Sequence, residues 1–293
     1  MFQVNASKYV RDKDFFVTDQ ASLDNPKSNA VMFIMQKSVE KAYQLLKVSN
    51  CLVFCEESVK LSPEIIEKHA IVYCENARLE YCRFFRDNQI QNLPKKEEFE
   101  FINGAYICKG SQIGDDTVVM PGAYICSTAI IGNRCYIGAG VRIVGIVKIG
   151  DDCIIRENSV IGADGLSTDR DRDGTAITMP QFGGVVIGNH VEIGALTVIA
   201  RGAIDNTIIN DGCKIDNSCF ISHNVQLGKD TFVVGESILF GSSSTGERAY
   251  ISGNATVRNK ATIGKDSFVG MGSVVTKNVP DNTIVYGNPA KSK

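Results

Sequence analysis

The sequence contains no tryptophan, only three histidines and no long hydrophobic run. Its apolar stretches, such as Cys51 to Cys55, are far shorter than the roughly 20 residues that cross a bilayer. The first residues also lack the apolar core of a secretory signal. Neither sign of charge dominates, and a net charge of −2 argues against a general nucleic-acid binder. We therefore expect a soluble, cytoplasmic protein with no membrane span and no nucleic-acid partner.

Ten cysteines leave a disulfide framework, a metal site or reduced thiols open at first. No two of them have CxxC spacing, and Cys51 and Cys55 are separated by three residues. Only three histidines are present, and His69 lies outside the repeat described next, so a three-histidine zinc site is excluded. We expect no metal site and thiols that remain reduced in the cytoplasm.

A period of six residues organises most of the chain beyond Phe101. Aliphatic residues recur at this period in three runs, which are Ile107 to Ile161, Ile187 to Ile199 and Ile209 to Val275, with Thr245 as the exception in the last run. A small residue follows four positions later in nearly every hexad, and cysteine takes this place at 135, 153, 213 and 219. A period of six does not match the 3.6 residues of a helical turn. The pattern predicts a mainly β fold, a parallel β-helix in which three hexads form one 18-residue coil.

Three regions depart from this period. Residues 1–100 lack it and are predicted to form a small N-terminal α/β domain followed by a polar linker. Expected strands are 30–35, 51–55 and 70–74, and expected helices are 38–47, 62–68 and 76–86. The β-helix is assigned to residues 101–280, with residues 164–186 looped out between two hexads. Residues 281–293 are assigned to a short tail.

Residues 18 positions apart should stack on one face of such a prism. His223 then stands in a column with Asp205 one coil before it and with Gly241, Asn259 and Lys277 on the following coils. This column suits acyl transfer, because an imidazole can accept the proton of an attacking amine. A carboxylate at Asp205 can fix its tautomer, and the Gly241 N–H can stabilise an oxyanion. The alternative is that His223 is an ordinary solvated corner residue.

Basic residues gather toward the end of the repeat. Arg258, Lys260 and Lys277, together with Asn259, are candidate contacts for the phosphates of an acyl donor. Their alternative role is ordinary solvation of the surface.

Several blocks of sequence carry a family resemblance. From Ile161 the chain contains IGADGL, MPQFGGVVIGNHVEIGA, RGAIDNTII and ISHNVQLG. These blocks resemble the UDP-3-O-acylglucosamine N-acyltransferase family of hexapeptide-repeat acyltransferases. The resemblance implies a left-handed β-helix, a homotrimer, an N-terminal nucleotide-sugar-binding domain and His223 as the general base. The residues that it suggests for nucleotide-sugar binding are Phe33, Met35, Gln181, Asp216 and Asn217.

Three departures from the family shape the functional prediction. Lys260 stands where the family has a second histidine, and the segment from Phe33 to Ser38 lacks the family's uracil-binding Asn and Tyr. The ending VVTKNVPDNTIVYGNPAK is similar to that of coenzyme A-dependent hexapeptide acetyltransferases.

Our leading prediction is an N-acyltransferase of glycan biosynthesis that uses a short acyl-CoA as co-substrate and has no bound cofactor. Its acceptor would be the amino group of a nucleotide-linked amino sugar, such as dTDP-4-amino-4,6-dideoxyglucose in an anthrose-type pathway. The first alternative is the lipid A enzyme, which uses 3-hydroxyacyl carrier protein as donor. The second is a non-catalytic β-solenoid scaffold.

Overall fold

The computed structural model describes residues 2–93 and 96–292, so positions 94 and 95 of the predicted linker lie outside it. The chain divides into two compact units. The N-terminal unit comprises residues 1–93 and 166–182, and the prism comprises residues 94–165 and 183–293. No helix in the described part of the chain is long and apolar enough to cross a membrane.

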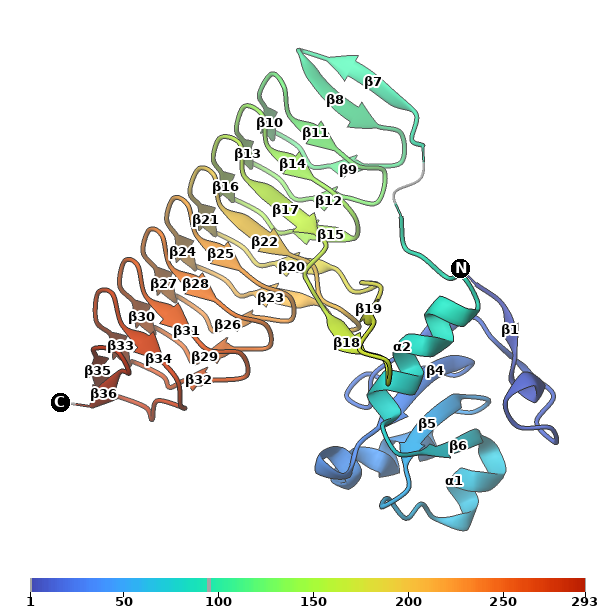
Figure 1. The fold of residues 1–293 in the computed structure, drawn as a ribbon. Coiled ribbons are helices and arrows are strands. Elements are labelled where there is room, and N and C mark those ends of the chain that lie inside the picture. Colours follow the sequence, from blue (N-terminus) through green and yellow to red (C-terminus); the bar gives the residue numbers. More distant parts are fainter. Residues whose placement is uncertain (1, 94–95, 293) are drawn as a thin grey trace. The chain divides into compact units, whose positions relative to one another are not determined.

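The N-terminal unit is built on a four-stranded parallel sheet (Figure 1). Its strands, in spatial order, are β3 (Asp19–Gln20), β4 (Ala30–Ile34), β5 (Leu52–Glu56) and β6 (Ala70–Cys74). The helices are η1 (Ala6–Lys8) and η2 (Gln36–Lys47), which are 3-10 helices, and α1 (Pro63–Lys68) and α2 (Ala77–Asp87). A small hairpin joins β1 (Val4–Asn5) to β2 (Phe16–Val17). The strands and helices predicted between residues 30 and 86 are therefore present, with boundaries that differ by at most two residues.

The segment predicted to be looped out folds as a hairpin of the N-terminal unit. It contains β18 (Thr168–Arg170) and β19 (Ala176–Thr178), which pair antiparallel. Asp169 accepts a hydrogen bond from Arg78 of α2 at 2.7 Å, and Asp171 contacts Arg83 and Arg86 of the same helix. These ion pairs hold the hairpin on α2 and lower the pKa of Asp171, mainly through its hydrogen bonds to the two arginines.

The prism has three parallel sheets, which we call the first, second and third faces (Figure 1). The first face consists of β7 (Phe99–Ile102), β8 (Ala105–Cys108), β11 (Tyr124–Ile125), β14 (Arg142–Ile143), β17 (Val160–Ala163), β22 (Val198–Ala200), β25 (Phe220–Ile221), β28 (Ile238–Leu239), β31 (Thr256–Val257) and β34 (Val274–Val275). The second consists of β9 (Gln112–Ile113), β12 (Ile130–Ile131), β15 (Val147–Ile149), β20 (Val185–Ile187), β23 (Thr207–Ile209), β26 (Gln226–Leu227), β29 (Ser244–Thr245) and β32 (Thr262–Ile263). The third consists of β10 (Val118–Val119), β13 (Tyr136–Ile137), β16 (Ile154–Ile155), β21 (Glu192–Ile193), β24 (Lys214–Ile215), β27 (Phe232–Val233), β30 (Tyr250–Ile251), β33 (Phe268–Val269), β35 (Ile284–Tyr286) and β36 (Lys291–Ser292). Only β7 and β36 pair antiparallel with their neighbours in these faces.

The core of the prism is filled by the repeating aliphatic residues, as the period predicts. The four cysteines of the small-residue position are at most 2% exposed and carry no disulfide. The segment predicted as a tail instead continues the prism, because β35 pairs parallel with β33.

The corners of the prism have their own sequence requirements. Asp116, Arg134 and Asp152 stand three positions after an inward aliphatic and have φ of 58°, 54° and 57°, in the left-handed region. Asn133 accepts a hydrogen bond through Oδ1 from the Asp115 N–H, one coil earlier, at 2.8 Å. A β-carbon on Gly132 would lie 2.6 Å from the backbone of the next coil. Glycine is thus required there by the close approach of two coils and not by its φ angle.

Candidate active site

His223 lies two residues beyond the end of β25, at the corner between the first and second faces. Ile221 pairs with Leu239, Leu239 with Val257 and Val257 with Val275. The residues two positions later therefore stack along this corner, and they are His223, Gly241, Asn259 and Lys277. The column predicted from the spacing is present on this side of His223.

The prediction that Asp205 lies directly below His223, on the preceding coil, is wrong. Ile221 pairs with Ile199, so Arg201 occupies the position below His223 and Asp205 does not. The cause is the 22-residue spacing between these two isoleucines, which inserts four extra residues into this coil. Asp205 reaches the corner through its backbone carbonyl, which accepts a hydrogen bond from Asn224 Nδ2 at 2.8 Å. A role for the Asp205 carboxylate stays a prediction.

Two glycines make room for the imidazole of His223. A β-carbon on Gly241 would lie 2.5 Å from Cε1 and 2.6 Å from Nε2 of the ring. On the other side, a β-carbon on Gly165 would lie 2.9 Å from Cβ and 3.1 Å from Cδ2. The ring is therefore held between Gly165 and Gly241, with Nε2 beside the backbone of Gly241.

The hydrogen bonds around the ring distinguish its two nitrogens. Nδ1 of His223 lies 3.2 Å from Oδ1 of Asn224, the next residue in the chain. Among the described residues, no hydrogen bond joins the Gly241 N–H to an acceptor. The corner thus presents an imidazole Nε2 next to a backbone donor. These are the two groups that a base and an oxyanion site require.

An ion pair lies on the coils before His223. Nη1 of Arg201 is 3.8 Å from Oδ1 of Asp164, and Arg201 Nε donates to the Gly183 carbonyl at 2.7 Å. The Arg201 side chain is only 9% exposed, and burial lowers its pKa. Burial also raises the pKa of Asp164, although the Arg201 charge opposes that shift. Asp164 precedes Gly165, so this pair adjoins the wall of the imidazole site.

The candidate donor-binding residues lie on the two coils after Gly241. Arg258, Asn259, Lys260 and Lys277 are all exposed. Lys260 has a φ of 63° and donates its backbone N–H to the Gly241 carbonyl at 3.1 Å. The structure thus places all four at or next to the His223 corner. Their contact with a donor stays a prediction.

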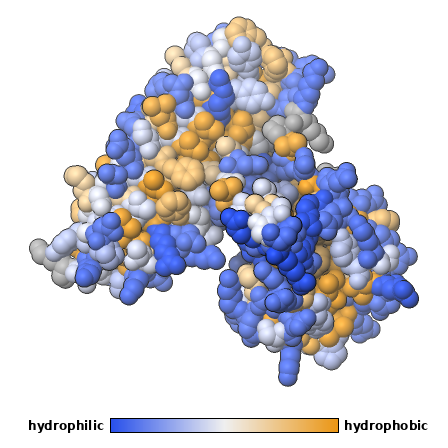
Figure 2. Space-filling model, in the orientation of Figure 1, coloured by the Kyte–Doolittle hydropathy of each residue, from blue (hydrophilic) through white to orange (hydrophobic). Residues whose placement is uncertain are grey.

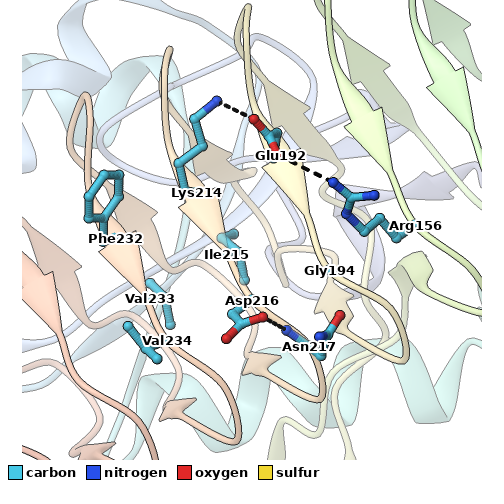
Figure 3. Close-up of a pocket in the computed structure, with 10 residues that line it drawn as sticks. All are labelled: Arg156, Glu192, Gly194, Lys214, Ile215, Asp216, Asn217, Phe232, Val233 and Val234. Atoms are coloured by element: carbon cyan, nitrogen blue, oxygen red, sulfur yellow. Dashed lines mark hydrogen bonds and ion pairs between the residues drawn. The ribbon is translucent and has the colours of Figure 1, made fainter.

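A separate cavity of 360 Å³ lies on the third face (Figure 3). Glu192 accepts a hydrogen bond from Lys214 at 2.9 Å, which is the main cause of its lowered pKa, and it lies 3.6 Å from Arg156. Asp216 and Asn217, the predicted sugar contacts, also line this cavity. The Asp216 carboxylate accepts from the backbone N–H groups of Asn217 and Gly235 at 2.7 and 3.1 Å. Within one chain, this carboxylate therefore binds backbone N–H groups at the corners of two successive coils.

The remaining predicted sugar contacts belong to the N-terminal unit. Phe33 and Met35 are half-buried at the end of β4, and the Phe33 ring packs against Tyr81 with centroids 5.0 Å apart. Gln181 is 1% exposed, and its Nε2 donates to the Met179 carbonyl at 3.0 Å. The Gln181 side chain thus bonds to the backbone two residues earlier in its own segment. In the described ranges, no group of three or more His, Cys, Asp or Glu side chains could hold a metal ion.

Comparison with known proteins supplies the context for this corner. The bacterial transferase hexapeptide (six repeats) model matches residues 110–145 and 130–163. The chain therefore carries the hexapeptide repeat over residues 110–163. The predicted resemblance to hexapeptide-repeat acyltransferases is confirmed by curated relatives. The UDP-3-O-acylglucosamine N-acyltransferase of Bordetella pertussis is 40% identical over 129 residues, which are 43% of this chain and 36% of that protein. The enzyme of the same name from Cytophaga hutchinsonii is 51% identical over 85 residues, which are 29% of this chain and 24% of the relative.

The chain thus matches about a third or less of the length of these two relatives. Two solved structures share its fold. UDP-N-acetylglucosamine acyltransferase from Campylobacter jejuni has a TM-score of 0.59 at 24% identity, and LpxA from Bacteroides fragilis has 0.60 at 22%. Each comparison covers 66% of this chain and 74% of the other. The predicted mainly β fold, a left-handed parallel β-helix with a small N-terminal α/β domain, is confirmed.

Sequence reasoning missed three residues of this corner. Asn224 follows His223 in ISHNV, and Gly165 is the fifth residue of IGADGL. Both therefore lie in sequence blocks that carry the family resemblance. Arg201 begins RGAIDNTII. The signal that could have found Arg201 is the spacing of Ile199 and Ile221, because alignment of these two isoleucines stacks Arg201 on His223.

Proposed function

We propose that this hexapeptide-repeat chain is an N-acyltransferase that acylates the amino group of a nucleotide-linked sugar. The observation that carries the proposal is the His223 ring between Gly165 and Gly241, with Nε2 beside the Gly241 backbone. The names of the curated relatives support the same reaction class.

The geometry suggests how each group acts. The sugar amine attacks the thioester carbonyl of the donor, and Nε2 of His223 accepts the proton that the amine loses. The Gly241 N–H donates a hydrogen bond to the oxyanion of the tetrahedral intermediate. The C–S bond then breaks, and the leaving thiolate takes the proton from His223. No cofactor is needed for this sequence of steps.

The relatives' names support UDP-3-O-acylglucosamine as the acceptor, and they support it better than a dTDP-linked dideoxysugar. By the same resemblance, 3-hydroxyacyl carrier protein is favoured over acyl-CoA as the donor. The short-chain acyl-CoA reaction remains the second candidate, because the segment from Phe33 to Ser38 lacks the family's uracil-binding residues.

The proposal includes a homotrimer. Asp216 follows β24 on the third face and His223 follows β25 on the first, so one prism holds them at different corners. Neighbouring prisms can bring a sugar-binding corner of one copy to the His223 corner of another. Outward residues of the first face, such as Val198, Phe220 and Ile238, are apolar and half-buried within one copy. Figure 2 shows hydrophobic residues gathered on the visible face of the prism. Light scattering that gives the mass of a single chain would contradict the trimer.

A thiol-release assay tests the reaction. UDP-3-O-acylglucosamine with 3-hydroxyacyl carrier protein, and dTDP-4-amino-4,6-dideoxyglucose with acetyl-CoA, are each supplied to the protein. We expect release of free thiol from the first pair, dependent on the acceptor. Release from the second pair alone would reverse the choice of substrates. Release from neither would favour a non-catalytic scaffold.

The His223→Ala variant tests the base. We expect turnover to fall by roughly 10²–10⁴, the usual contribution of general acid–base catalysis. His190→Ala is the matched control, because His190 is exposed at another corner of the same prism. Equal turnover of the two variants would remove His223 from the mechanism.

A further inference from the structure

Asn224 is held by two hydrogen bonds of its side chain and one of its backbone. Its Oδ1 accepts a hydrogen bond from the Ala203 N–H at 3.0 Å, and its Nδ2 donates to the Asp205 carbonyl at 2.8 Å. Its own backbone N–H donates to Thr207 Oγ1 at 2.8 Å. The residue also has a φ of 59°, a conformation that Asn adopts more readily than most residues.

These bonds settle which end of the amide faces His223. Turning the amide over would place its NH₂ against the Ala203 N–H and its oxygen against the Asp205 carbonyl, so both bonds would be lost. Oδ1 is therefore the atom that lies 3.2 Å from Nδ1 of His223. An amide oxygen only accepts, so this contact is a hydrogen bond only when Nδ1 carries the proton.

We propose that Asn224 is a positioning residue that selects the Nδ1–H tautomer of His223, in which Nε2 is the unprotonated nitrogen that can accept a proton. The inference rests on the proposed function, in which Nε2 beside Gly241 is the base. It assigns to a neutral amide the role that the sequence suggested for the Asp205 carboxylate. A neutral partner orients the ring without adding a negative charge to stabilise the imidazolium.

The pH dependence of kcat/KM separates orientation from general stability. Asn224→Asp keeps an oxygen for Nδ1 but adds a charge, so the imidazolium is stabilised and the base stays protonated to higher pH. We expect the acidic limb of the profile to move upward by about one to three pH units, as an opposite charge at this distance usually causes. The charges of Asp164, Arg201, Asp205 and Lys260 are unchanged in this variant. An unmoved limb would overturn the proposal.

Asn224→Ala tests the loss of orientation. We expect kcat/KM to fall by roughly 10–100-fold, the range found when the hydrogen-bond partner that orients a metal-binding histidine is removed. Two variants control for the fold. Asn189→Ala removes a similar bond, in which Oδ1 accepts from the Asp151 N–H at 2.9 Å. Asn254→Ala places alanine at another left-handed corner, with φ of 55°. Both should retain wild-type kcat/KM, and a loss in either control equal to that of Asn224→Ala would overturn the proposal.

The tautomer can also be read without any activity measurement. Long-range ¹⁵N–¹H correlation of ¹⁵N-histidine protein distinguishes the protonated ring nitrogen, and the chain has only three histidines to assign. We expect Nδ1–H at His223 and a mixture of tautomers in Asn224→Ala. Nε2–H in the wild-type protein would overturn the proposal even if His223→Ala is inactive. If His223→Ala retains full turnover while the tautomer is Nδ1–H, the proposed function fails and the orientation of the ring stands.

Discussion

The two units of this chain differ in where their aromatic residues lie: in the core of the N-terminal unit and on the outer surface of the prism. In the N-terminal unit, Phe54, Tyr81, Phe84 and Phe85 are at most 2% exposed. In the prism, aromatic rings lie on the outside, where Tyr250 stacks on Phe268 with centroids 5.1 Å apart. The interior of the prism contains Ile, Val and Leu with small residues instead. The winding of the coil fixes the width of the prism, whereas a helix can pack on a sheet at the distance that its side chains require.

The same contrast separates their chemistry. The stacked coils of the prism repeat a corner at a fixed spacing, which places His223 against Gly241 and leaves no room for a side chain at position 241. The N-terminal unit holds its hairpin by ion pairs between α2 and the segment around Asp171. Close contact between stacked coils thus forms the corner that carries the proposed base.

The largest effect on stability is expected in the aromatic core. Phe84→Ala should destabilise the N-terminal unit by about 3–5 kcal/mol, because it removes a ring that contacts Phe2, Tyr9, Phe54 and Phe85. Chemical denaturation followed by circular dichroism measures the loss. Phe16→Ala is the control, since Phe16 is 48% exposed, and it should cost less than about 0.5 kcal/mol. Similar losses in both variants would show that the aromatic cluster does not stabilise this unit.

A smaller effect tests the narrowness of the prism. Cys153 is fully buried and donates through Sγ to the Gly188 carbonyl at 3.1 Å, as Ser159 Oγ donates to the Gly194 carbonyl at 2.6 Å. Cys153→Leu should cost about 1–3 kcal/mol, because the slot has no room for a larger side chain. Cys153→Ser should cost less, because serine can make the same bond. If leucine is tolerated as well as serine in denaturation experiments, the width of the prism is not what excludes large residues.

The prism could be predicted because its signal repeats. Every hexad tests the same geometry, so the inward aliphatics, the cysteine slot and the stack from His223 to Lys277 all follow from one period. Counting by eighteen fails only where the coil has extra residues, which is why Asp205 was placed in the position of Arg201. The left-handed backbone at charged corner residues such as Arg134 could not be predicted either. The turn of the coil imposes this conformation on the corner position, whichever residue occupies it.

Contacts of single side chains could not be predicted in this way. Asn224 depends on a carbonyl from Asp205 and an N–H from Ala203, and both lie in the irregular coil where the period is lost. The docking of Asp169 and Asp171 on α2 joins segments about 90 residues apart, and nothing local in either segment indicates its partner. The six-residue period predicts the position of the His223 corner. The hydrogen bonds that orient the ring come from the coil in which extra residues interrupt that period.

The smallest expected effect is a pH dependence confined to the N-terminal unit. His69 is fully buried there, and its Nδ1 accepts from the Cys51 N–H at 3.2 Å while Nε2 contacts the Leu45 carbonyl at 3.1 Å. Burial lowers the pKa of His69 below its ordinary value of 6.5, so the folded state favours the neutral ring. The stability contribution is therefore complete above pH 6.5 and declines as the pH falls below it toward the lower pKa of the folded state. Thermal unfolding should show this decline as the pH falls below about 6.5 in the wild-type protein. It should be absent in His69→Gln, whose amide can replace both bonds, and present in His190→Gln, which changes an exposed histidine of the prism. A decline that persists in His69→Gln would assign the pH dependence to other groups.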